Sequence, residues 1–168
     1  MVYPGILIAD YVISKGGGRF TPLQIGKLVY ISHGYTLALE NRRLVRDRIE
    51  AWKYGPVVPA IYHALKHNGG SRVSRLQYSN TGVGSESMRE RADFFESVIG
   101  LKDRGVIDRV LECYGHLTGR DLSGITHAKG TPWSECYRPD GLHISIPDGM
   151  IKKHYKGLLA PAGASDTD

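Results

Sequence analysis

Residues 21–41 read TPLQIGKLVYISHGYTLALEN, and this stretch decides the fold class. Thr21 can accept hydrogen bonds from the free amides of a first helical turn, and Pro22 suits the first helical position. Gln24 stands three residues after the threonine, as in a capping box. The apolar side chains that follow are spaced by three and four, as along one face of a helix: Leu28, Ile31, Tyr35 and Leu39. The stretch predicts a long helix that ends near residue 41.

Two glycines, Gly26 and Gly34, lie inside this predicted helix. A glycine in a helix interior costs about 1 kcal/mol of stability relative to alanine. We therefore expect a neighbouring segment to approach the helix closely at both positions.

Further helices are indicated on both sides of this stretch. Periodicity or capping residues mark segments 4–14, 57–67, 87–100, 103–114 and 148–156, and shorter helices are expected to begin after Thr118 and at Pro132. Extended backbone is expected at 49–53 and 143–146, and a loop at 71–86. The sequence predicts a mainly α fold: a compact single-domain bundle of six or seven helices with a minor short β element. This domain spans residues 1–158, and residues 159–168 form a disordered polar tail.

Composition narrows the class of protein. The chain has 168 residues, which fits one domain. It has no apolar run near the roughly 20 residues that span a bilayer, so no membrane partner is expected. The two cysteines, Cys113 and Cys136, are too few for a disulfide framework. Without a secretory leader at its start, the sequence favours a cytoplasmic protein.

The net charge of +5 would attract a nucleic acid or an acidic protein surface. Residues 42–48 hold four arginines against the single acid Asp47. No predicted helix is densely basic along one face, and the tyrosines are too scattered to form a stacking platform. A nucleic-acid partner is therefore disfavoured, and a nucleic-acid-binding regulator is kept as an alternative function.

The histidines and cysteines offer a second alternative, an enzyme. His63 and His67 stand four apart on a predicted helix, but the glutamate of a zinc-protease motif is missing between them. A thiol nucleophile requires a histidine nearby as its base. Cys136 lies near two histidines in the sequence, His127 and His143. Neither pattern is specific, and we expect no catalytic residue, metal or cofactor.

Two clusters combine aromatic side chains with prolines. Residues 51–59 read AWKYGPVVP, and residues 123–133 include Thr126, His127, Pro132 and Trp133. Prolines fix the direction of the chain, and aromatic rings give a large contact area at a small entropy cost. These residues either plug the core or form a surface for a partner protein.

The same clusters resemble the motifs of the SocA-like antitoxins, the Panacea domain family, which includes phage-associated GepA proteins. TPLQ at 21–24 leading into KLVY at 27–30 is similar to the opening motif, and IEAWKYGPV at 49–57 to the most distinctive one. Residues 122–133 are similar to the closing motif. The resemblance runs from about residue 6 to residue 156, and it departs from the family at Gly26, where a larger residue is common.

This resemblance implies an antitoxin that binds and neutralises a toxin protein, which an adjacent gene is expected to encode. It raises two routes of neutralisation, occlusion of the toxin and delivery to the ClpXP protease, and the sequence leaves both open. The expected partner-binding residues are Trp52, Lys53, Tyr54, Gly55, Pro56, Val57 and Tyr62, with Arg46 and Arg48 for charge. The remaining motif residues are expected to be structural or binding: Lys27, Leu28, Tyr30, Thr126, His127, Pro132 and Trp133.

Overall fold

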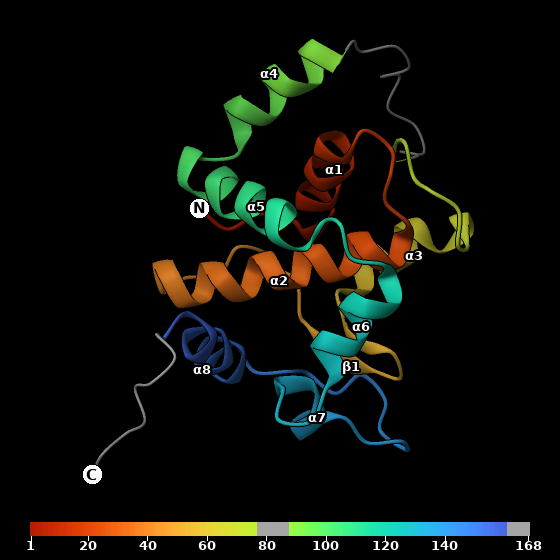
Figure 1. Ribbon diagram of the computed structural model, residues 1–168, viewed down its shortest axis with the longest axis vertical. Coiled ribbons are helices and arrows are strands. Elements are labelled where there is room, and N and C mark those ends of the chain that lie inside the picture. The colour runs from red at the N-terminus through yellow and green to blue at the C-terminus, as the bar shows by residue number, and fades with distance from the viewer. Residues whose placement is uncertain (77–87, 161–168) are drawn as a thin grey trace.

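The computed structural model describes residues 1–76 and 88–160 of the chain (Figure 1). Its helices are α1 (Gly5–Gly16), α2 (Pro22–Glu40), α3 (Pro59–Leu65), the 3-10 turn η1 (Lys66–Asn68), α4 (Met88–Val98), α5 (Leu101–Tyr114), α6 (Gly119–His127), α7 (Pro132–Cys136) and α8 (Asp148–Leu159). The strands are β1 (Glu50–Trp52) and β2 (Gly55–Val57). The predicted mainly α class with a minor β element is confirmed, with eight α-helices in the described ranges where six or seven were expected.

Helix α2 is the centre of the fold (Figure 1). It packs against α1, α5, α6 and α8. The predicted capping box is present: the Gln24 amide donates to Thr21 Oγ1 at 3.4 Å, and the Thr21 amide donates to Gln24 Oε1 at 2.9 Å. The helix ends at Asn41, whose backbone is left-handed with φ 54°. Because neighbours surround it, α2 buries residues on several faces rather than along one stripe.

The two glycines of α2 have different environments. A Cβ atom on Gly34 would lie 2.2 Å from the ring of Tyr155, so α8 approaches the helix closely there, as predicted. A Cβ atom on Gly26 would meet nothing within 4 Å. The prediction of close approach is therefore wrong for Gly26.

Strands β1 and β2 form an antiparallel hairpin, in which Glu50 pairs with Val57 and Trp52 with Gly55. Extended backbone at 49–53 is thus confirmed. The strand predicted at 143–146 is reduced to an isolated bridge between Glu50 and Ser145. Two backbone bonds flank this bridge, from the Ala51 amide to the Ile144 carbonyl and from the Ile146 amide to the Ile49 carbonyl. No described helix has the length and hydropathy to cross a membrane.

The hydrophobic core lies between α2 and the helices around it. Its largest fully buried apolar side chains are Tyr30, Phe20, Phe95, Ile8, Ile13, Ile25, Leu28, Ile31, Leu44, Ile49 and Ile61. Helix α8 runs through Leu159, and the rest of the predicted tail, from residue 161, lies outside the described residues. Most of the loop predicted at 71–86 lies outside them too, from residue 77 onward.

Candidate functional site

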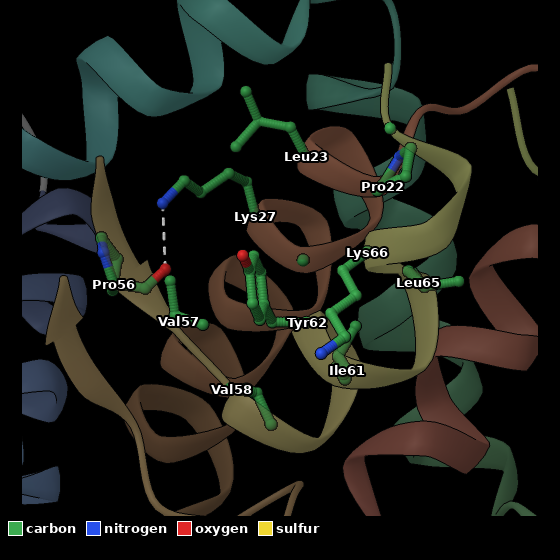
Figure 2. Close-up of a pocket in the computed structure, with 12 residues that line it drawn as sticks. Pro22, Leu23, Lys27, Pro56, Val57, Val58, Ile61, Tyr62, Leu65 and Lys66 are labelled. Carbon is green, nitrogen blue, oxygen red and sulfur yellow. Dashed lines mark hydrogen bonds between the residues drawn. The ribbon is translucent and has the colours of Figure 1, made fainter. Parts of the chain in front are cut away.

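The hairpin is held from one side by a buried lysine of α2. Lys27 is only 2% exposed, and its Nζ donates a hydrogen bond to the carbonyl oxygen of Pro56 at 2.9 Å (Figure 2). Burial lowers the pKa of this amine to about 7. The opening motif and the most distinctive motif therefore meet at a hydrogen bond between two residues that are 29 positions apart in the sequence.

Gly55 makes this approach possible. Its φ is +106°, a conformation that side chains rarely adopt, and a Cβ there would lie 2.5 Å from Lys27 Nζ. The same Cβ would lie 3.4 Å from Oγ1 of Thr126, a buried residue of α6. Gly55 is therefore a structural requirement of the site, and it offers no side chain to a partner.

Two side chains from the closing motif hold the hairpin from another direction. Ser123 Oγ donates to the Tyr54 carbonyl at 2.8 Å, and Trp133 Nε1 donates to the Trp52 carbonyl at 2.7 Å. With the Lys27 bond, every second carbonyl from residue 52 to residue 56 accepts a hydrogen bond from a side chain of a helix. All three sequence motifs thus serve to fix one short hairpin in place.

This anchoring leaves several hairpin side chains at the surface. Tyr54 is 65% exposed at the turn, and the Lys53 ammonium lies 5.3 Å from the centre of its ring. Trp52 is half-buried; its Nε1 donates to Glu50 Oε2 at 2.8 Å, and its ring meets that of Tyr62 edge-on at 4.9 Å. The hairpin therefore presents aromatic area on a backbone that is already fixed.

An apolar groove lies beside the hairpin, between β2, α2 and α3 (Figure 2). Its volume is about 320 Å³. The residues that line it are Pro22, Leu23, Gly26, Lys27, Pro56, Val57, Val58, Ile61, Tyr62, Leu65, Lys66 and Gly69. Leu23, Gly26, Ile61, Leu65 and Lys66 were not predicted as site residues. The spacing of Ile61 and Leu65 on one helix face marked them only as core, and a groove between three separate segments leaves no local pattern in the sequence.

The structure separates the expected site residues into groups. Trp52, Tyr54 and Tyr62 lie at or near the surface, whereas Leu28 and Tyr30 are core residues. The remaining closing-motif residues form an inner layer: the His127 ring meets that of Trp133 at 5.2 Å, Trp133 stacks on Tyr137, and Pro132 is buried.

The basic residues at 42–48 are divided as well. Arg42 pairs with Asp103 at 2.5 Å, and Arg43 pairs with Asp148 at 3.0 Å, so both take part in the fold. Arg46 and Arg48 are exposed, and within residues 1–76 and 88–160 neither side chain forms an ion pair. No hydrogen bond in that range joins them to the hairpin.

The cysteine and histidines that the sequence analysis considered for catalysis or metal binding lie outside the anchors of the hairpin. The Cys136 thiol contacts Met150 Sδ at 3.7 Å, and burial raises its pKa, which disfavours the reactive thiolate. His143 contacts Glu50 at 3.2 Å. His63 packs edge-on against Trp52 and Tyr62. In the part of the chain that the structure describes, no three His, Cys, Asp or Glu residues are grouped to hold a metal ion.

Comparison with known proteins gives a consistent result. The model of the family described as antitoxin SocA-like, Panacea domain, matches residues 25–134, which include all three anchors of the hairpin. The chain is 28% identical over 174 residues to Antitoxin SocA of Caulobacter vibrioides, covering 95% of this chain and 88% of that protein. No solved structure matches. The chain belongs to the family of SocA-like antitoxins with a Panacea domain.

Proposed function

We propose that this chain neutralises a toxin protein by binding it directly, with the hairpin and the adjoining groove as the contact surface. The observation that supports this most is the combination of a fixed backbone with exposed side chains. Three helix side chains hold the carbonyls of residues 52, 54 and 56, while Tyr54 remains 65% exposed. A surface ordered before binding loses less conformational entropy on association.

The chemistry of the surface suits a protein partner. Tyrosine and tryptophan are enriched among the residues that dominate the binding energy of protein interfaces. The rings of Trp52 and Tyr62 pack in a T-shaped arrangement, and Tyr54 stands at the turn of the hairpin that carries Trp52. An interface of standard size would bury about 1,600 Å² in total, more than the hairpin offers, so the groove side of α3 belongs to the proposed surface.

Arg46 and Arg48 have a separate proposed role. Their side chains are exposed and unpaired within the described residues. Charges at the rim of an interface chiefly accelerate association and contribute less to affinity. We assign them to the attraction of an acidic toxin surface, outside the main contact.

The direct test is co-purification with the product of the adjacent gene, expressed with this chain and compared with each protein alone. The expected result is a stoichiometric complex, and growth that is rescued only when this chain is present. A neighbour that neither binds nor inhibits growth would contradict the proposal. A steep fall of DNA affinity with added salt would then favour the nucleic-acid-binding alternative.

Occlusion and delivery to the ClpXP protease are both routes to neutralisation, and the lifetime of the toxin distinguishes them. If this chain acts as an adaptor, its presence shortens the half-life of the toxin, and loss of ClpX abolishes that effect. If it occludes the toxin, growth is rescued equally in cells with and without ClpX.

A further inference from the structure

The wall of the groove on the α2 side contains a residue without a side chain. Gly26 lines the groove, and a Cβ added to it would meet no atom within 4 Å. Its φ is not in the positive range that favours glycine. In a helix interior, such a glycine costs about 1 kcal/mol against alanine. Unlike Gly34, which makes room for the ring of Tyr155, Gly26 makes room for no side chain of residues 1–76 or 88–160.

The space at Gly26 is suited to an apolar group. Leu23, Val57 and Ile61 supply aliphatic walls, and Tyr62 lies between Lys27 and Lys66 in the close-up (Figure 2). The volume of about 320 Å³ lies at the small end of the range for ligand pockets. One large apolar side chain with its flanking backbone therefore matches the groove better than an extended ligand.

The charge of the groove has a single sign. Its described lining includes two basic side chains, Lys27 and Lys66, and no acidic one. The Lys27 amine is buried and already bonded to Pro56. Lys66 is exposed at the rim and forms no ion pair within residues 1–76 and 88–160. A carboxylate beside the apolar group can therefore pair with Lys66 at the mouth of the groove.

We infer that the groove receives one phenylalanine or leucine side chain of the toxin protein, next to an acidic residue that pairs with Lys66. The identity of the toxin as the source rests on the proposed function. Gly26 keeps the groove open, and a large side chain at this position would fill it.

Synthetic pentapeptides test the groove without the toxin. The probe carries phenylalanine between two glutamates, with blocked ends; one control has alanine at the centre and a second has lysines in place of the glutamates. Binding to the full chain is followed by amide shifts in ¹H–¹⁵N NMR spectra at low salt. The acidic phenylalanine peptide should move the amides of Gly26, Ile61, Leu65 and Gly69, the lysine peptide should bind at least threefold more weakly, and the alanine peptide should not bind.

Two leucine substitutions form a matched pair for this test. Gly26→Leu places a side chain in the groove, whereas Gly105→Leu places one on the exposed face of α5, where a Cβ also meets nothing within 4 Å. Both remove a helix-interior glycine, so both should raise the melting temperature. Only Gly26→Leu should weaken the acidic phenylalanine peptide at least tenfold. Equal binding by the two variants, or no binding to the unmodified chain, would overturn the inference.

Lys66→Gln tests the charge pairing, with Lys102→Gln on α5 as its control. Lys66→Gln should abolish the difference between the acidic and basic peptides, and Lys102→Gln should preserve it. Shifts of the same groove amides with protein concentration alone would assign the groove to a second copy of this chain and overturn the inference.

Binding of the co-expressed toxin to the two leucine variants distinguishes failure of this inference from failure of the proposed function. A toxin that binds the unmodified chain and Gly105→Leu but not Gly26→Leu supports both. A toxin that binds all three equally leaves the proposed function standing and overturns the groove as its docking site. If no adjacent gene product binds, the proposed function fails, and the peptide series still decides what the groove accepts.

Discussion

The two halves of α2 make opposite use of a glycine. In the C-terminal half, Gly34 lies against the ring of the buried Tyr155, and helices α2 and α8 interlock there. In the N-terminal half, Gly26 borders an open groove beside an anchored hairpin. The same residue type in the same helix thus serves packing at one position and leaves space at the other. The difference teaches that packing explains the glycine at position 34 and does not explain the one at position 26.

The largest expected effect is the destabilisation caused by Gly34→Ala. Its Cβ would lie 2.2 Å from a carbon of the Tyr155 ring, which is only 3% exposed and has little room to move. Overpacking of this kind typically costs about 3 kcal/mol at the upper end of its usual range. Gly26→Ala, in contrast, should raise the free energy of unfolding by about 1 kcal/mol. Urea unfolding measures both, and effects of the same sign would remove the contrast between the two halves.

The buried amine beside the hairpin gives the next effect. Burial lowers the pKa of Lys27 to about 7 in the folded chain, below the ordinary lysine value that applies to the unfolded chain. Between these values the unfolded chain binds more protons, so stability increases as the pH rises through this window. We expect about 2 kcal/mol of added stability between pH 7 and pH 8.5.

Lys27→Met isolates this contribution, because methionine keeps the apolar stem and cannot titrate. Its free energy of unfolding should depend less on pH over the same window. The raised pKa of Cys136 lowers stability where the unfolded thiol ionises, so it opposes the effect only towards the top of the window. The raised pKa values of Tyr30 and Tyr35 lower stability at still higher pH. An unchanged slope from pH 7 to pH 8.5 in Lys27→Met would show that the amine remains charged in the fold.

A smaller effect is expected from removing one anchor of the hairpin. Trp133→Phe retains a ring beside Tyr137 and His127 but loses the Nε1 donor to the Trp52 carbonyl. An acceptor left without its partner costs about 1.5 kcal/mol. Hydrogen exchange should accelerate at the amides of residues 51–57, while those of α8 keep their protection. Uniform acceleration in both regions would indicate a global loss of stability instead of a looser hairpin.

These features differ in how far the sequence predicts them. Thr21 and Gln24 specify the start of α2, because a capping box involves only local hydrogen bonds. The anchors from Lys27, Ser123 and Trp133 reach carbonyls 29 to 81 residues away, and a carbonyl acceptor has no residue-specific code. Lysine is also rarely buried in proteins, so the sequence alone favours an exposed position for Lys27. The motifs therefore include all three anchors, and only the fold shows which carbonyl each of them holds.

The smallest effect on stability is expected for Tyr54→Ala, and it separates the presented surface from its support. The Tyr54 side chain is 65% exposed, whereas its carbonyl accepts the Ser123 bond, and alanine retains that carbonyl. The free energy of unfolding should change by less than about 0.5 kcal/mol. Affinity for the co-purified toxin should fall about tenfold, equal to about 1.4 kcal/mol of binding energy. Leu101→Ala, which truncates an exposed side chain at the start of α5, should change neither quantity. If calorimetry gives the same dissociation constant for Tyr54→Ala and Leu101→Ala, the hairpin turn lies outside the interface, and binding has to be sought along the groove alone.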